Sequence, residues 1–426
     1  MIRFLVTPFI VLILSLTATQ ATACSMYKVT VNGKTMVGCN HDTWLETPHI
    51  WFETKGYGAA FTGARYDGTN GIAPQSGMNE FGLVFSRLAA ATPKAKIVGA
   101  NKKQIDTPTL YLKNVLHSCK TVADVKTYIE NYDHSVFSQD VFIYIDRLGN
   151  YLIVEPYLLT EGKDSSYVLA NFCPSEIVDF STITQQRYKK GKAVLTTNSS
   201  TSLAFCVTLS DTMSVCRTAH GDGTLLTSIW DNTAGNVHLC FYHNYEHQLQ
   251  FNLAHELSLG NHSIDVVKLF PPNKEFKQLQ AYKTPLNSKG MDLALRLWLG
   301  FFLLSSVCWG VSFVVKKHVQ SYRYLKLGLV LFNLIMTYYV FVLGTDVGIY
   351  YFKAPYQSAH SLLFNVEGYI ALLLPVIVII LLVVLVKITQ QKVWGVFSKG
   401  LLALNILSYG AIMILAFYWG LYNVLG

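Results

Sequence analysis

The chain has 426 residues, of which 51% are hydrophobic and 14% charged, and its formal net charge is +8 at pH 7. A mean hydropathy of +0.31 excludes a soluble protein of ordinary make-up. We find no combination of basic and aromatic residues typical of nucleic-acid binding. The apolar excess lies mostly after residue 290, which predicts a soluble unit of about 265 residues followed by a membrane region.

Residues 1–23 have the pattern of a secretory signal peptide. A short positive region precedes an apolar run, and Ala21-Thr22-Ala23 forms a small-x-small cleavage site. Cleavage there makes Cys24 the first residue of the mature chain. Such a residue carries a thiol and an α-amine whose pKa of about 7.7–8.0 suits a general base. Two other roles stay open, the lipidated cysteine of a lipoprotein and one half of a disulfide, although Ala21 is a poor match for a lipidation site.

Asp42 is the next candidate site residue. Residues 25–37 predict two strands joined by Asn32-Gly33, which is a strong hairpin signal. Because the two arms have similar lengths, the hairpin brings Asp42 back towards Cys24. A carboxylate there can hold the α-ammonium or orient the thiol. The alternative is an ordinary aspartate at the end of a strand.

The following stretch alternates strands and helices. Thr107-Pro108 predicts a helix start, Thr121 and Asp124 a capping box, and residues 146–150 the turn of a second hairpin. This order predicts an α+β layered domain. Further along the chain we expect a strand that ends at residues 171–172, a helix that begins at 185–190 and a second helix over about 202–214. Strands at 226–230 and 237–242 and a polar linker at 264–290 are expected to follow.

Four apolar stretches predict membrane spans, because each is long enough as a helix to cross a bilayer. They cover residues 293–315, 325–342, 368–386 and 401–422. The loops after the first and third spans are basic. The positive-inside rule places them in the cytoplasm, and the N-terminal unit therefore lies outside it. The spans carry little ionisable chemistry, so an anchor is expected rather than an ion path.

The cysteines leave several possibilities open. Eight are present, and a secreted domain permits disulfides, although the sequence does not assign pairs. No Cys-x-x-Cys or Cys/His spacing indicates a metal site. We therefore expect neither a metal nor a cofactor.

In order, these pieces resemble the Cys-type N-terminal-nucleophile (Ntn) hydrolases, a superfamily that includes choloylglycine (bile salt) hydrolases, penicillin V acylases and isopenicillin N acyltransferase-like proteins. The similarity covers residues 24–255. It rests on Cys24 at the cleavage point, on the Gly-x-Asn-x-Asp box at residues 38–42, and on the Met-Asn-Glu-x-Gly-Leu turn at residues 78–83. Asn171 followed by Arg187 completes it.

The resemblance implies an αββα sandwich and four roles. Cys24 would be the nucleophile, Asp42 would hold its amine and thiol, Asn171 would supply an oxyanion donor, and Arg187 would brace the site electrostatically. Without the resemblance, Asn171 would be a turn residue and Arg187 a surface charge. One departure is that many relatives carry an arginine where this chain has Cys39. Another is that residues 86–91 lack the asparagine of bile salt hydrolases, which leaves a second oxyanion donor unassigned.

The expected organisation is a signal peptide at 1–23, an Ntn-hydrolase-like ectodomain at 24–263, a linker at 264–290 and a four-span transmembrane region at 291–426. The expected function is a multi-pass membrane amidase that cleaves a linear, non-peptide C–N bond of a small N-acyl amide outside the cytoplasm. Alternatives are an acyltransferase of the same fold, a non-catalytic receptor or lipoprotein, and a transport component.

Overall fold

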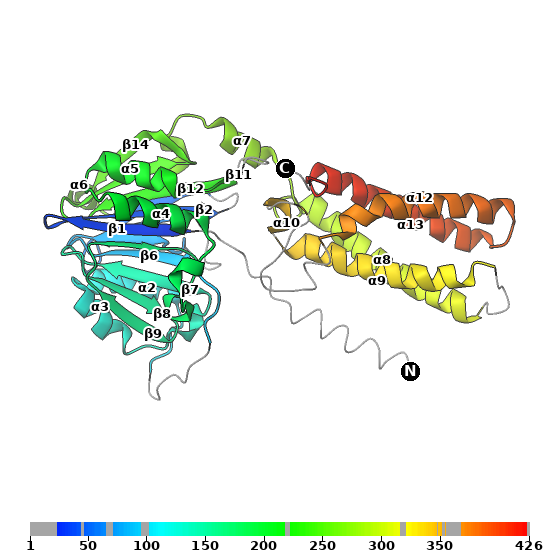
Figure 1. The fold of residues 1–426 in the computed structure, drawn as a ribbon, viewed down its shortest axis with the longest axis horizontal. Helices are drawn as coiled ribbons and strands as arrows, with labels where there is room; N and C mark the ends of the chain where they lie inside the picture. The colour runs from blue at the N-terminus through cyan, green and yellow to red at the C-terminus, as the bar shows by residue number, and fades with distance from the viewer. Residues whose placement is uncertain are drawn as a thin grey trace. The chain divides into compact units, whose positions relative to one another are not determined.

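The computed structural model describes residues 24–43, 47–64, 71–94, 102–217, 222–315, 321–346, 348–351, 354 and 368–423. The chain divides into two compact units, Thr22–Ala281 and a unit that includes Tyr282–Gly426. The first unit contains the sheets, and the second contains the long apolar helices (Figure 1).

Two antiparallel sheets form the first unit. The first has the order β10-β1-β2-β12-β13-β14, with β11 (Cys216–Arg217) paired to β12, and the second has the order β15-β3-β4-β5-β6-β7-β8-β9. The strands of the first sheet are β1 (Ser25–Val31), β2 (Lys34–Thr43), β10 (Ser166–Leu169), β12 (Asp222–Asp231), β13 (Asn236–Phe241) and β14 (Asn244–Asn252). Those of the second are β3 (His49–Glu53), β4 (Ala59–Gly63), β5 (Ser76–Asn79), β6 (Val84–Ala89), β7 (Asp140–Ile145), β8 (Tyr151–Glu155), β9 (Leu158–Gly162) and β15 (His262–Asp265).

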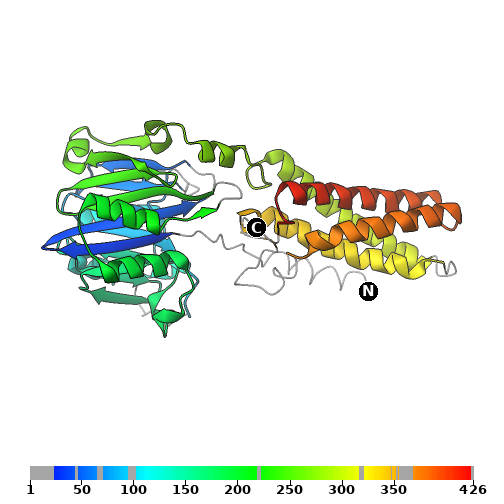
Figure 2. The same cartoon turned by 45° about the horizontal axis from the view of Figure 1, so that its top comes forward.

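Helices cover the outer faces of both sheets (Figures 1 and 2). Helices α4 (Gln186–Thr197) and α5 (Leu203–Thr212) pack on the first sheet, and α2 (Pro108–Ser118) and α3 (Val122–Ile129) pack on the second. The inner faces meet, since Ser76 Oγ of β5 lies 3.0 Å from Ser228 Oγ of β12. The expected αββα sandwich is therefore confirmed. Shorter elements are α6 (Leu253–Ser258), α7 (Lys274–Ala281) and the 3-10 turns η1 (His134–Phe137), η2 (Pro174–Glu176), η3 (Phe180–Thr182) and η4 (Val266–Leu269).

The first hairpin has the predicted geometry. Asn32 and Gly33 adopt φ angles of 50° and 76°, as a two-residue turn that matches the strand twist requires. Ser25 pairs with Asn40 across the hairpin. Cys24, which immediately precedes β1, is thereby brought beside the end of β2 that carries Asp42, as expected from the equal arms.

Of two predicted helix starts, one is confirmed in full and the other in part. The capping box at Thr121 and Asp124 is confirmed, with both reciprocal hydrogen bonds present. Helix α2 begins at Pro108 as predicted, but the Thr107 side chain makes no capping hydrogen bond, so that part of the prediction is wrong. Proline at the first position leaves one fewer unpaired N–H group in the first turn of the helix.

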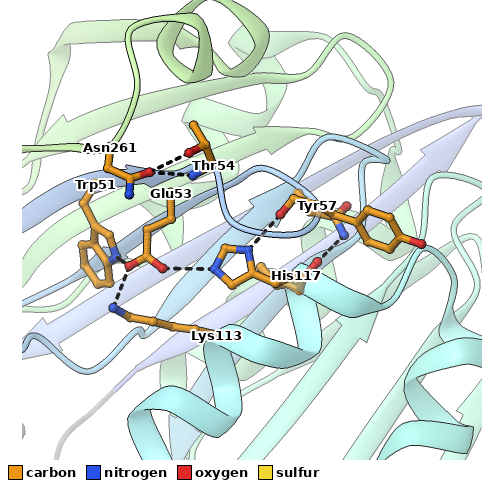
Figure 3. Close-up of polar contacts among 9 residues, drawn as sticks. Trp51, Glu53, Thr54, Tyr57, Lys113, His117 and Asn261 are labelled. Atoms are coloured by element: carbon orange, nitrogen blue, oxygen red, sulfur yellow. Dashed lines mark hydrogen bonds and ion pairs between the residues drawn. The ribbon is translucent and has the colours of Figure 1, made fainter.

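A charged cluster fastens α2 to the end of β3 (Figure 3). The Glu53 carboxylate accepts hydrogen bonds from Lys113 Nζ at 2.7 Å and from His117 Nε2 at 3.0 Å, and the other His117 ring nitrogen lies 2.8 Å from the Tyr57 carbonyl oxygen. Both ring nitrogens of His117 face oxygen atoms, so the ring is held from two sides. Burial alone would raise the pKa of Glu53, but the hydrogen bonds and charges of His117 and Lys113 outweigh it and lower this pKa to about 2.

The second unit contains four helices that are long and apolar enough to cross a membrane, among the residues that the structure describes. Their bounds are α8 (Lys289–Val315), α9 (Arg323–Thr345), α12 (Ile370–Gln390) and α13 (Val396–Tyr418), and a short α10 covers Gly348–Tyr351. Helix α8 packs against α9 and α13, and α12 packs against α13. The four predicted apolar stretches are therefore present as helices, with ends shifted by a few residues.

A buried polar network joins three of these helices. Ser305 of α8 lies 2.8 Å from Asn405 Nδ2 of α13 and 3.2 Å from Asn333 Nδ2 of α9. Tyr409 of α13 donates to Asn333 Oδ1 at 2.6 Å. Hydrogen bonds between apolar helices satisfy polar groups that lipid cannot, so this network fixes the register of the three helices.

Candidate active site

Cys24 lies buried at the start of β1, with 4% of its surface exposed. In the full-length chain its nitrogen belongs to the peptide bond with Ala23, so a free amine exists only after cleavage. Burial, and then the negative charge of Asp42, raise the pKa of the Cys24 thiol to about 12, although the Asp42 backbone N–H and the charge of Arg187 act in the opposite direction. The thiol is therefore protonated at neutral pH and needs a base to become a nucleophile.

His41 does not act as that base in this structure. It follows Asn40 in β2 and is 2% exposed, and neither ring nitrogen has a hydrogen-bond partner. Burial lowers the pKa of His41 to about 3, so its ring is neutral. His41 therefore forms no hydrogen-bonded pair with Cys24.

Asp42 is placed as predicted, near the thiol. It is 2% exposed, and its backbone N–H and its charge both act on the Cys24 sulfur. The Thr224 hydroxyl donates a 2.6 Å hydrogen bond to Asp42 Oδ1. Since β12 pairs with β2 and sets Thr224 opposite Asp42, this contact follows from the sheet register.

Arg187 connects the other predicted residues. Its Nε donates to the backbone oxygen of Cys24 at 3.2 Å, and one of its terminal nitrogens donates to Asn171 Oδ1. Arg187 stands in the first turn of α4, which packs on β1 and β10. The planar, forked guanidinium suits two acceptors at once. Cys24, Asn171 and Arg187, distant in the chain, thus meet at one place.

Asn171 follows the end of β10 and is fixed from two sides. Its Nδ2 donates to the Ala89 carbonyl at 2.7 Å, and Gln185 Nε2 donates to the Asn171 carbonyl at 3.2 Å. A primary amide has two N–H donors, so the bond to Ala89 uses only one of them.

Two site residues were missed by the sequence reasoning. Gln185 contacts both Asn171 and Arg187, and its place two residues before Arg187 is the only signal that pointed to it. Thr224 had no signal at all, because its contact with Asp42 depends on pairing between strands that are far apart in the chain.

Cys39, the residue at which the sequence departs from the Ntn-hydrolase pattern, is buried in β2. Burial raises its pKa to about 12, although hydrogen bonds with Ser86, Ser76 and Ser228 act to lower it. The three serines belong to β5, β6 and β12. A neutral thiol among hydroxyl groups therefore stands at this position.

The described cysteines are present as thiols. Among the cysteines that the structure describes in full, seven are free thiols: Cys24, Cys39, Cys119, Cys173, Cys206, Cys240 and Cys308. Within the described ranges, no group of three or more His, Cys, Asp or Glu side chains could hold a metal ion.

A cavity of about 100 Å³ opens elsewhere in the first unit. Its walls come from the end of α3, from η1 and from the turn between β8 and β9, and include His134, Glu155 and Tyr157. Cys24, Asp42, Asn171 and Arg187 do not line it. The cavity is therefore separate from the thiol.

Comparison with known proteins gives a likeness of fold. No protein-family model and no curated protein matches the chain. The structure is similar to a cysteine-to-alanine mutant of conjugated bile acid hydrolase from Clostridium perfringens, with 15% identity, a TM-score of 0.44, and coverage of 59% of this chain and 97% of that one. An arginine-to-leucine variant of the same hydrolase is 16% identical, with a TM-score of 0.42 and coverage of 59% of this chain and 98% of that one. Penicillin V acylase from Agrobacterium tumefaciens is 14% identical, with a TM-score of 0.45 and coverage of 57% of this chain and 91% of that one.

Proposed function

We propose that this protein is a membrane-anchored amidase that cleaves a linear, non-peptide amide bond through an acyl-enzyme on Cys24, after removal of residues 1–23. One observation carries the proposal. Arg187 binds the Cys24 backbone oxygen and the Asn171 side chain, while Asp42 lies beside the same thiol. A buried nucleophile with an amide donor, a cation and a carboxylate around it is the set that acyl transfer needs.

The first half of the reaction forms a thioester. The α-amine of processed Cys24 accepts the thiol proton, and the sulfur attacks the substrate carbonyl carbon. The second N–H of Asn171 donates to the oxyanion of the tetrahedral intermediate, where one such donor contributes about 3–4 kcal/mol. The C–N bond then breaks, and the leaving amine takes the proton from the α-ammonium.

The second half restores the enzyme. Water attacks the thioester, the acid leaves and the sulfur regains its proton. In this proposal Asp42 supports both halves, because its carboxylate, whose charge acts on the Cys24 thiol, pairs with the α-ammonium when the amine holds the proton. No metal or cofactor is required by this sequence of steps.

The proposed location is a membrane with the first unit on the side away from the cytoplasm. Four apolar helices support membrane insertion. The orientation rests on the basic residues around them, such as Arg323, Lys387 and Lys399. Protease added to sealed inside-out and right-side-out vesicles tests it, since only right-side-out vesicles should lose the first unit.

The catalytic proposal is tested with the full-length protein in detergent micelles. The protein is incubated with long-chain and short-chain N-acyl ethanolamides, penicillin V and glycocholate, and then quenched in acid for peptide mass spectrometry. We expect a substrate-dependent mass increase on the peptide that begins with Cys24, and product amine released in solution. A Cys24→Ala variant that releases amine at the wild-type rate would refute the proposal.

A further inference from the structure

Thr224 is the buried residue on which the inference rests. Its side chain is fully buried and donates to Asp42 Oδ1 at 2.6 Å. The same hydroxyl oxygen accepts the Val215 backbone N–H at 2.9 Å. A hydroxyl has one proton to give, so with Val215 as its donor that proton is directed to the carboxylate.

The backbone around Thr224 holds the hydroxyl in this position. The pairing of β12 with β2 shifts between Thr224 and Leu226, as a bulge does, and bulges are frequent next to functional sites. The Thr224 N–H donates to the Val215 carbonyl at 2.7 Å, and its carbonyl accepts from the His243 N–H at 3.2 Å. Both main-chain groups and the hydroxyl of Thr224 are therefore engaged.

The bulge is stabilised by an uncommon turn. Tyr242 and His243 follow β13 with φ angles of 54° and 43°, a conformation that non-glycine residues seldom adopt. The Tyr242 N–H donates to the Leu225 carbonyl at 2.9 Å. Leu225 is the residue that the bulge inserts between Thr224 and Leu226, so this turn holds the irregularity that aims Thr224 at Asp42.

We propose that Thr224 is a positioning residue that fixes the Asp42 carboxylate in the orientation from which it meets the α-ammonium of processed Cys24. The inference rests on the function proposed above and assigns a residue that this function did not use. The hydrogen bond from Thr224 restricts rotation of the Asp42 carboxylate about its last torsion, and so limits the directions in which its two oxygens point. Thr224 itself does not reach the scissile bond.

The test compares four variants of the full-length protein. Thr224→Val removes the hydroxyl at nearly constant shape. Thr224→Ser and Thr224→Ala form a second pair that differs only in the hydroxyl. Thr227→Val is the matched control, because Thr227 is also buried in β12 and its hydroxyl donates at 2.8 Å, but to Asn40.

Turnover of the best substrate among the N-acyl ethanolamides, penicillin V and glycocholate gives kcat and KM. We expect Thr224→Val and Thr224→Ala to lose about 10- to 100-fold in kcat at little change in KM, as the loss of one hydrogen bond to a charged group implies. Thr224→Ser and Thr227→Val should stay close to the wild type. A thermal melt of each variant identifies any that fail to fold. If Thr224→Val does not fold, the comparison of Thr224→Ser with Thr224→Ala tests the role of the hydroxyl instead.

The outcomes separate the two proposals. Active wild type with equally active Thr224→Val and Thr224→Ala would overturn the role of Thr224 alone. A Thr224→Ser variant as poor as Thr224→Ala would do the same, because the methyl group and not the hydroxyl would then matter. Wild-type protein that cleaves no substrate and forms no adduct at Cys24 would instead overturn the proposed function.

Discussion

Replacing Arg187 by alanine should damage the proposed site without unfolding the protein. The change removes the hydrogen bonds that Arg187 donates to the Cys24 backbone oxygen at 3.2 Å and to Asn171 Oδ1, together with a longer one of 3.4 Å to Gln185 Oε1. It also removes a positive charge that lowers the pKa of the Cys24 thiol.

The magnitude follows from these contacts. A hydrogen bond that involves a charged group is worth about 1.5–3 kcal/mol, so two such bonds are worth about 3–6 kcal/mol. Arg187 is only half-buried, and water can replace part of what is lost. The lower end, about 3 kcal/mol, corresponds to a fall of roughly 100-fold in kcat/KM. Arg187→Lys keeps the charge but not the planar guanidinium that reaches two acceptors, and its kcat/KM should fall about tenfold.

The assay is kcat/KM of the full-length protein on its best amide substrate, with a thermal melt of each variant. Lys190→Ala is the matched control, because Lys190 is an exposed cation in the same helix. We expect the highest kcat/KM for the wild type and Lys190→Ala, a lower value for Arg187→Lys, and the lowest value for Arg187→Ala. Wild-type kcat/KM in Arg187→Ala would refute the reasoning that Arg187 holds Cys24 and Asn171 together.

Three further predictions concern other parts of the molecule. Asp42→Asn keeps the size of the side chain but removes its charge, and should lower kcat by about 100-fold or more in the same turnover assay, since an amide cannot pair with the α-ammonium. Glu53→Gln should lower the melting temperature at pH 7. Because the pKa of Glu53 in the folded chain is about 2, below its ordinary value, the stabilisation is present above pH 4.5 and is lost towards pH 2. Thermal melts over this pH range should show that the difference in melting temperature between variant and wild type shrinks as the pH falls. Asn405→Leu should lower the melting temperature in detergent by the loss of contacts worth about 1–2 kcal/mol, and an unchanged value would show that the Ser305 network does not hold the helices.

The hairpin of β1 and β2 was predictable because its signals are local. Asn32-Gly33 specifies the turn, and the equal arms place Asp42 near Cys24. The capping box at Thr121 is of the same kind, since its partners are three residues apart. The four long apolar helices were predictable in number and place, because length and apolar character alone define them.

The rest of the site depends on long-range pairing that no local pattern reports. Asn171 and Arg187 were proposed only through the resemblance to Ntn hydrolases, since each alone is typical of a turn or a helix surface. Thr224 reaches Asp42 because β12 lies beside β2 with a bulge at that point. The Glu53 and His117 pair likewise joins a strand end to a helix across 64 positions of sequence.

The measurement that tests the central claim most directly is the mass and N-terminal sequence of the mature chain isolated from its membrane. We predict a chain that starts at Cys24 with a free α-amine, which reacts with an aldehyde to form a thiazolidine because amine and thiol share one residue. A chain that starts elsewhere, or that carries an acyl or lipid group on the Cys24 nitrogen, would contradict the account, since the thiol would then lack the base assigned to it.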